Sequence, residues 1–201
     1  FCNGAKVREA VFLDRDGTVT EEVGYVNHLD RLKLIPGAAS AISRLNRAGI
    51  LVILATNQAG VARGYFPEEL VGQVHRQLEE LLAQEGAHLD AIYYCPHHPQ
   101  VGPPPYRKSC NCRKPAGGML LEAAEKFSID LSRSFMVGDK ITDPITGMRL
   151  GAKGILVLTG YGKGEYIYQR KNWQTQPDFI APDLNGAVDW ILTQRRQRKG
   201  A

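Results

Sequence analysis

The chain has 201 residues, of which 43% are hydrophobic and 23% are charged, values typical of a globular protein rather than of collagen, a coiled coil or a disordered chain. Its net charge is only +4, and its basic residues are scattered apart from residues 195–199, so we expect no nucleic-acid partner and a solvated basic tail over residues 195–201. The longest strongly apolar run, residues 50–55, is far shorter than the roughly 18 residues of a membrane helix, so we expect one domain of residues 1–201 and no membrane partner.

Short apolar runs rich in β-forming residues alternate with segments of helical periodicity along the whole chain. Strands are predicted at residues 7–13, 50–55, 91–95, 134–137, 154–158 and near Phe179, and helices at residues 36–49, 67–85, 115–127, 143–150 and 184–193. This alternation predicts an α/β domain with a doubly wound parallel sheet, covered by helices on both faces. Ligands of such sheets bind beyond the carboxyl ends of the strands, where the strand order reverses.

Polar residues follow the predicted strands at the positions where a ligand would bind. They are Asp14 and Asp16 after the first strand, Thr56 after the second, Asp139 and Asp143 after the fourth, and Lys114 just before a helix. Carboxylates gathered in one crevice repel one another unless a cation is bound. Mg²⁺ meets this need, because it prefers carboxylate oxygens and shares its coordination shell with substrate phosphate oxygens.

The same residues contain the parts of a phosphoryl-transfer site. Asp14 and Asp16 are separated by one residue, so on a continuing strand they would face the same way, one as nucleophile and the other as acid and base. Lys114 offers a positive charge and Thr56 a hydroxyl donor to the phosphoryl oxygens. Each motif alone is also typical of an acidic turn or a helix cap; their joint order behind predicted strands favours the functional interpretation.

Four segments together resemble the four motifs of the haloacid-dehalogenase-like phosphohydrolases: residues 14–18, 56–58, 114–115 and 138–140. The resemblance implies a Rossmann-like fold in which Asp14 forms an aspartyl-phosphate, while Asp16 protonates the leaving group and then activates water. It also implies that Mg²⁺ is held by Asp14, Asp139 and the backbone carbonyl of Asp16. Thr56 and Lys114 would hold the phosphoryl oxygens, and Asp143 would lie just outside the metal ligands.

A cluster of cysteine and histidine residues occupies a long proline-rich loop, residues 95–113. Cys95, Cys110 and Cys112 offer three thiolates, and His97 or His98 offers the fourth donor of a tetrahedral structural zinc site. We choose His97, because it alternates with Cys95. Free surface thiols are the alternative, and a bridge between Cys110 and Cys112 fits disulfide geometry poorly. Cys2 receives no role.

The Cys-Pro-His and Cys-x-Cys-Arg-Lys-Pro motifs, together with residues 57–66, resemble the D,D-heptose 1,7-bisphosphate phosphatases. This narrower resemblance implies a cytoplasmic, Mg²⁺- and Zn²⁺-containing enzyme of lipopolysaccharide or related glycan synthesis that hydrolyses the C7 phosphate of D-glycero-D-manno-heptose 1,7-bisphosphate. We expect it to be a monomer. Histidinol-phosphate phosphatases share the zinc loop and are the nearest alternative, and a zinc-stabilised binding module is an alternative outside the enzymes. Ala59 departs from the serine common in the family.

Substrate selection is expected to come from loops around an open site. Only 57 residues lie between Thr56 and Lys114, and the predicted strand, helix and zinc loop account for them, so no cap domain is expected. Arg113 suits the second phosphate of a bisphosphate, because its planar guanidinium binds oxygens in pairs. The resemblance adds further substrate contacts: Glu22, Val23, Gly24, Tyr25, Asn57 and Lys140.

Two further features receive no functional role. The glycine-rich segment 160–164 lacks the spacing of a phosphate-binding loop and is interpreted as a flexible turn. His75 lies within a helical pattern and is interpreted as a solvated or satisfied histidine rather than a catalytic base.

Overall fold

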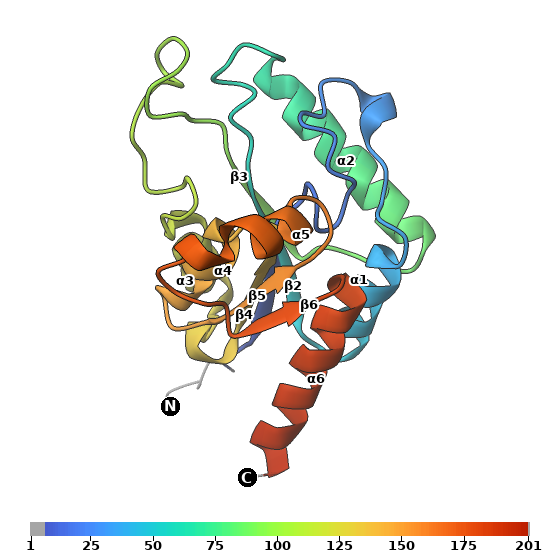
Figure 1. Cartoon of the computed structure of the whole chain (residues 1–201). Helices are drawn as coiled ribbons and strands as arrows, with labels where there is room; N and C mark the ends of the chain where they lie inside the picture. The colour runs from blue at the N-terminus through green and yellow to red at the C-terminus, as the bar shows by residue number, and fades with distance from the viewer. Residues whose placement is uncertain (1–6, 201) are drawn as a thin grey trace, which may run out of the picture.

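A computed structural model describes residues 7–200 of the chain, so Cys2 lies outside the described residues. The core of the fold is a single parallel sheet with the strand order β3-β2-β1-β4-β5-β6 (Figure 1). Its strands are β1 (Ala10–Leu13), β2 (Leu51–Asn57), β3 (Ala91–Cys95), β4 (Phe135–Gly138), β5 (Lys153–Val157) and β6 (Phe179–Ala181). The strand order reverses between β1 and β4, so the predicted doubly wound α/β architecture is confirmed.

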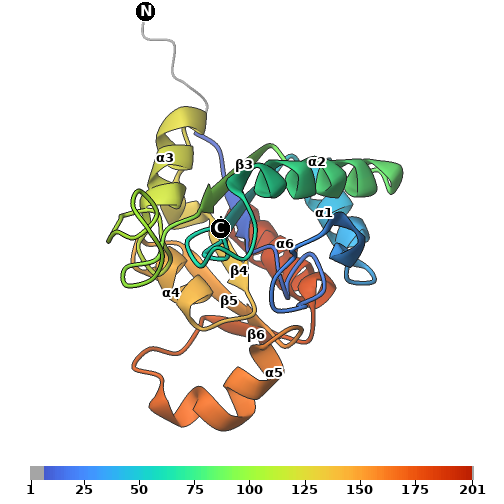
Figure 2. The same ribbon diagram turned by 90° about the horizontal axis from the view of Figure 1, so that it is seen from above.

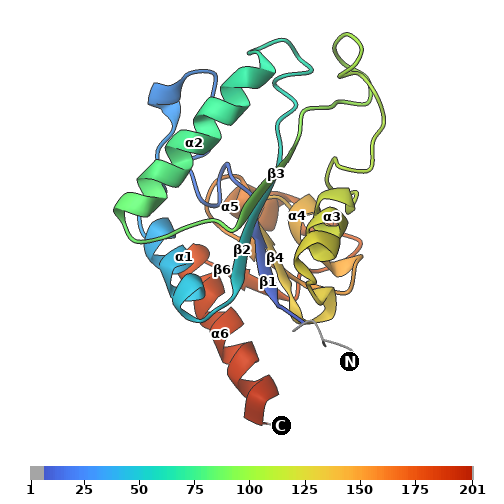
Figure 3. The same ribbon diagram turned by 180° about the vertical axis from the view of Figure 1, so that it is seen from behind.

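Helices cover both faces of the sheet (Figure 3). They are α1 (Ala38–Arg47), α2 (Glu68–Gln84), α3 (Gly118–Phe127), α4 (Thr142–Met148), the short α5 (Gly162–Gly164) and α6 (Leu184–Gly200). Strand side chains alternate between two apolar cores: Val11 and Leu13 pack with α1, α2 and α6, whereas Phe12 packs on the opposite face with α3. Two-sided burial explains why the strands are continuous apolar runs.

Helix α1 shows how the sequence pattern produces this packing. Its buried residues Ala38, Ala41, Ile42 and Leu45 recur at the spacing that places side chains on one helical face. Serine, asparagine and arginine residues occupy the rest of the helix surface. Helix α1 therefore lies flat on the sheet and returns the chain from β1 to the adjacent β2.

The basic C-terminal segment differs from the prediction. The prediction ends the last helix at residue 193, but helix α6 continues to Gly200. Residues 195–200 are therefore helical, and Arg196, Gln197 and Arg198 are exposed to solvent as expected. Arg195 forms an ion pair with the buried carboxylate of Glu9, and Arg198 donates to the Arg133 carbonyl at 3.1 Å. Because Arg195 and Arg198 find these partners near the amino ends of β1 and β4, the contacts stabilise the last turns of the helix.

The glycine-rich segment 160–164 also differs from the prediction. It is the start of a helical excursion made of α5, a π-helical turn (Glu165–Gln169) and a 3₁₀ turn (Arg170–Asn172). In Figure 2 this orange excursion projects beside β5 and β6, at the edge of the molecule away from α3 and α2. The prediction of a turn therefore holds for residues 160 and 161, but it is wrong for residues 162–164, which are helical.

The connections between strands contain no inserted cap domain within residues 7–200. The segment between Thr56 and Lys114 holds only α2, β3 and the loop that follows β3, which rises above the sheet in Figure 1. None of the helices described has the length and apolar character needed to cross a bilayer.

Candidate active site

A pocket of about 290 Å³ opens at the carboxyl ends of β1, β2 and β4. The sequence-predicted residues that line it are Asp14, Asp16, Glu22, Gly24, Tyr25, Thr56, Asn57, Arg113, Lys114, Lys140 and Asp143. These residues come from segments far apart in the chain, and the sheet brings them together because parallel strands end at one edge. The pocket therefore lies where the sequence analysis expected a ligand.

Lys114 is the buried positive charge at the floor of the pocket. Its ammonium lies 2.8 Å from Asp14 Oδ1 and 2.7 Å from Asp143 Oδ1. Burial alone would lower the pKa of Lys114, but these two carboxylates raise it by more, so the pKa lies above its ordinary value. Lys114 therefore stays charged, and it can stabilise negative charge that develops beside Asp14.

Asp139 faces the same cluster with an oxygen that has no partner. Its Oδ2 accepts a hydrogen bond from the Tyr161 amide at 2.8 Å, whereas its buried Oδ1 has none. Burial, followed by the charges of Asp14 and Asp143, raises the pKa of Asp139 to about 8. Burial raises the pKa of Asp143 to about 6, where the lowering effect of Lys114 opposes it and the charge of Asp14 reinforces it.

The donor set of this cluster fits a hard divalent cation. Oxygen atoms of Asp14, Asp139 and Asp143 lie within 4.8 Å of one another. Three buried carboxylates face one buried ammonium, so a bound cation would offset their repulsion and partner the free Oδ1. Asp143 is already engaged on both oxygens, by Lys114 and by the Lys140 amide at 3.1 Å.

Asp16 comes from the turn after β1 rather than from a continuing strand. Its carboxylate accepts two hydrogen bonds from Arg15, at 3.1 and 3.0 Å, and one from Gln58 at 3.0 Å. Burial alone would raise the pKa of Asp16, but Arg15, Gln58 and Thr20 lower it by more, so the pKa lies below its ordinary value. The Asp16 carboxylate is therefore ionised in this arrangement.

Gln58 and Arg15 are contributors that the sequence analysis did not single out. The Gln58 amide nitrogen donates to Thr56 Oγ1 at 2.9 Å as well as to Asp16, so one side chain aligns two predicted catalytic groups. The Thr56 hydroxyl proton is left free to donate into the pocket. Arg15 is only 1% exposed and also contacts His75 Nε2 at 3.2 Å. Such buried polar networks arise from tertiary packing, and no local pattern marks them.

Three of the predicted substrate-contacting residues, Asn57, Arg113 and Val23, make contacts within the chain itself. Asn57 lines the pocket, but its amide oxygen and nitrogen both bond to the backbone of Lys114, at 3.0 and 3.1 Å. Arg113 donates to the His97 carbonyl at 3.2 Å. Val23 is not among the pocket-lining residues described, and its side chain packs on the core. The loop turns the Val23 side chain inward, so a contact of Val23 with the substrate stays a prediction that would have to involve its backbone.

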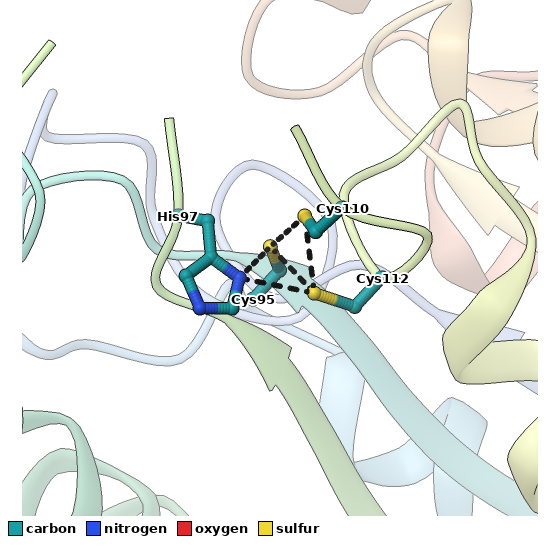
Figure 4. Close-up of side chains that lie close together, drawn as sticks. All are labelled: Cys95, His97, Cys110 and Cys112. Atoms are coloured by element: carbon teal, nitrogen blue, oxygen red, sulfur yellow. Dashed lines mark hydrogen bonds between the residues drawn. The ribbon is translucent and has the colours of Figure 1, made fainter. Parts of the chain in front are cut away.

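The predicted zinc ligands gather into one cluster (Figure 4). The Sγ atoms of Cys95, Cys110 and Cys112 lie 3.0 to 3.5 Å apart, and His97 Nδ1 lies 3.3 Å from Cys112 Sγ. Tetrahedral zinc with bonds of about 2.3 Å separates its sulfur ligands by about 3.8 Å, so a zinc ion fits after a small outward shift. His98 points elsewhere, since its Nδ1 accepts from the amides of Gln100 and Val101 at 3.1 Å.

The arrangement as a whole defines a class of protein. A buried carboxylate cluster at the switch point of a doubly wound sheet, with a lysine and a threonine hydroxyl beside one carboxylate, is the equipment of an enzyme that transfers phosphoryl groups.

Comparison with known proteins agrees with this class. The family model described as HAD-hydrolase-like matches residues 111–187. The D-glycero-D-manno-heptose-1,7-bisphosphate 7-phosphatase of Thermosynechococcus vestitus is 49% identical over 197 residues, which cover 95% of this chain and 99% of the relative. The D-glycero-beta-D-manno-heptose-1,7-bisphosphate 7-phosphatase of Escherichia coli K12 is 39% identical over 190 residues, which cover 94% of this chain and 90% of the relative.

A solved structure gives the same result. The D,D-heptose 1,7-bisphosphate phosphatase of B. bronchiseptica, complexed with magnesium and phosphate, superimposes with a TM-score of 0.82 at 32% identity, over 92% of this chain and 99% of that chain. The chain therefore belongs to the haloacid-dehalogenase-like hydrolases, and within them to the family of the D-glycero-D-manno-heptose-1,7-bisphosphate 7-phosphatases.

Proposed function

We propose that this protein is a Mg²⁺-dependent phosphatase that hydrolyses the C7 phosphate of D-glycero-D-manno-heptose 1,7-bisphosphate. The observation that carries the proposal is the contact of Lys114 with Asp14 inside the pocket, next to the unpartnered Oδ1 of Asp139. Relatives that are 49% and 39% identical over nearly the whole chain carry the same activity in their names. The pocket volume, about 290 Å³, suits a small polar substrate.

Asp14, Asp139 and the backbone carbonyl of Asp16 would hold the magnesium ion. When bound, it offsets the charge of the carboxylates and of the phosphoryl oxygens that approach them. The same chemistry is supported by the related B. bronchiseptica structure, which contains magnesium and phosphate. We also propose that Cys95, His97, Cys110 and Cys112 hold a structural zinc ion, since four protein ligands leave no open position for catalysis.

The chain's own residues supply the two chemical steps. In the first, a carboxylate oxygen of Asp14 attacks phosphorus, the bond between phosphorus and the C7 oxygen breaks, and Asp16 gives its proton to the leaving alkoxide. In the second, Asp16 takes a proton from water, which attacks the aspartyl-phosphate and releases inorganic phosphate. Lys114 and Thr56 stabilise the phosphoryl oxygens throughout.

The low pKa of Asp16 suits one of these steps better than the other. An ionised Asp16, paired with Arg15, is ready to act as the base of the second step. The acid role of the first step needs a proton on the same carboxylate. A phosphate dianion arriving beside Asp16 would raise its pKa by like-charge repulsion, so protonation would accompany substrate binding.

The remaining pocket residues would select the substrate. Arg113 stands beside Lys114 at the rim and suits the C1 phosphate, because its guanidinium can bind two oxygens. Glu22, Gly24, Tyr25, Asn57 and Lys140 surround the space between and would contact the sugar.

The test is phosphate release by the purified full-length protein, with and without Mg²⁺, from both anomers of the heptose bisphosphate and from histidinol phosphate. We expect Mg²⁺-dependent release from the heptose bisphosphate with the highest kcat/KM, and a loss of at least about 10³-fold in Asp14→Asn. A higher kcat/KM for histidinol phosphate would assign the protein to that reaction. Unchanged activity of Asp14→Asn would exclude the aspartyl-phosphate mechanism.

A further inference from the structure

The segment from Thr159 to Glu165 contacts the loop that carries Asp139 in several independent ways. The Tyr161 amide donates to Asp139 Oδ2 at 2.8 Å. The Thr159 hydroxyl donates to the Gly17 carbonyl at 2.6 Å, and Glu165 accepts from the Ile141 amide at 2.9 Å. This one segment therefore contacts both the turn after β1, at Gly17, and the loop after β4, at Asp139 and Ile141.

Two glycines enclose Asp139 between them. Gly17 and Gly160 both have positive φ, at +81° and +54°. A Cβ atom built on Gly17 would lie 2.0 Å from Asp139 Oδ2, and one built on Gly160 would lie 2.2 Å from the same oxygen. A side chain at either position would displace the Asp139 carboxylate, which is fully buried. The carboxylate thus has a single orientation, with Oδ2 bonded and Oδ1 free.

The side chain of Tyr161 adds a contact on the pocket side. The ammonium of Lys140 lies 4.5 Å from the centre of the Tyr161 ring, a distance typical of a cation–π interaction. Both residues line the pocket. The segment therefore restrains the residue that follows Asp139 as well as Asp139 itself.

We propose that residues 159–165 act as a brace that orients Asp139 for the divalent cation, with Gly160, the Tyr161 amide and the Thr159 hydroxyl as positioning groups. The proposal rests on the Mg²⁺-dependent function proposed above. Groups that orient a metal ligand commonly change metal affinity by about 10- to 100-fold when they are altered. The brace also gives a role to the glycine-rich segment whose spacing fits no phosphate-binding loop.

The first test is Gly160→Ala, measured by titration calorimetry with Mg²⁺ alone on the full chain. The added methyl group must displace the Asp139 carboxylate, so we expect the Kd for Mg²⁺ to rise by at least about tenfold. Two matched controls separate this clash from other effects. Gly151→Ala also has positive φ, +88°, but open space around its Cβ, and Gly164→Ala lies in the brace itself with nothing within 4 Å. Both controls should bind Mg²⁺ like the wild type.

The second test uses variants that keep the backbone unchanged. Thr159→Val removes the hydroxyl that bonds to Gly17 and should weaken Mg²⁺ binding by roughly 2- to 10-fold, the equivalent of one hydrogen bond. Thr159→Ser keeps the hydroxyl and should restore wild-type affinity. If Gly160→Ala does not fold, this pair still tests whether residues 159–165 orient Asp139 for Mg²⁺.

The outcomes separate this inference from the proposed function. If the wild type binds Mg²⁺ and both Gly160→Ala and Thr159→Val bind it equally well, the brace is refuted while the proposed function stands. If the wild type binds no Mg²⁺, the proposed metal dependence fails, and the brace fails with it.

Discussion

Arg15, between the two aspartates of the first motif, links the catalytic pocket to helix α2. Its guanidinium bonds to Asp16 on one side and contacts His75 Nε2 on the other. A guanidinium can only donate, so Nε2 accepts and His75 is neutral, with its proton on Nδ1. His75 thus helps to position Arg15, which in turn binds the Asp16 carboxylate. The interpretation of His75 as a satisfied histidine agrees with this contact.

At the residue scale, His75 predicts a pH dependence of stability. Burial, and after it the charge of Arg15, lowers the pKa of His75 from its ordinary value of 6.5 to about 3. Between these values the unfolded chain binds a proton that the folded protein does not, so the free energy of unfolding falls as the pH falls. Between pH 7.5 and pH 5 this loss is about 2 kcal/mol.

The measurement is urea unfolding of the wild type and of His75→Gln at both pH values. Glutamine can accept from Arg15 but does not titrate, so the variant should lose about 2 kcal/mol less than the wild type between pH 7.5 and pH 5. Equal losses in the two proteins would show that His75 is not the titrating group.

At the element scale, the loop 95–113 brings three thiols and one imidazole into one cluster. Its ends are fixed, because Cys95 ends β3 and Cys112 directly precedes Arg113 and Lys114 of the pocket. A structural zinc ion would therefore position these two cationic side chains, which line the pocket. Loops of this length without regular structure need such a constraint to stay ordered.

The matched pair His97→Ala and His98→Ala tests this assignment. We expect the wild type and His98→Ala to contain about one equivalent of zinc by metal analysis after purification, and His97→Ala to contain much less. Loss of zinc should also lower Tm and raise KM, because the loop would no longer place Arg113. Zinc below about half an equivalent in the wild type would argue against a structural site.

At the scale of the whole molecule, the two apolar cores share the central strands. Residues of β1 alternate between the two cores, and Arg195 ties α6 to Glu9 next to β1. Because both cores pack against the same strands, loss of packing in one core would also disrupt the other. We therefore infer one cooperative domain over residues 7–200.

This inference predicts a single two-state unfolding transition. In calorimetry, the van't Hoff and calorimetric enthalpies should agree. In Trp173→Phe, the fluorescence of Trp190 on α6 should change at the same temperature as the helical circular dichroism signal. Separate transitions for these two probes would indicate independently folding units instead.

Much of the fold followed from local patterns. The ends of β3 were predicted to the residue, and β2, α1 and α2 within a few residues, because their apolar periodicity reflects burial on a sheet. The errors lie where contacts distant in sequence decide. Helix α6 continues past residue 193 because Arg195 and Arg198 find partners at the base of the sheet, and residues 160–164 are held by Asp139.

By itself, the sequence determined which chemical groups would meet. The elements next to the polar groups have a hydrophobic periodicity that is visible in the local sequence; these groups are Asp14, Thr56, Lys114 and Asp139. A parallel sheet gathers such positions at one edge. Only the tertiary structure decided how those groups are oriented: the turn that places Asp16 on Arg15 and Gln58, the inward side chain of Val23, and the glycines around Asp139. Orientation depends on packing between distant segments, and a pattern read along the chain carries no information about that packing.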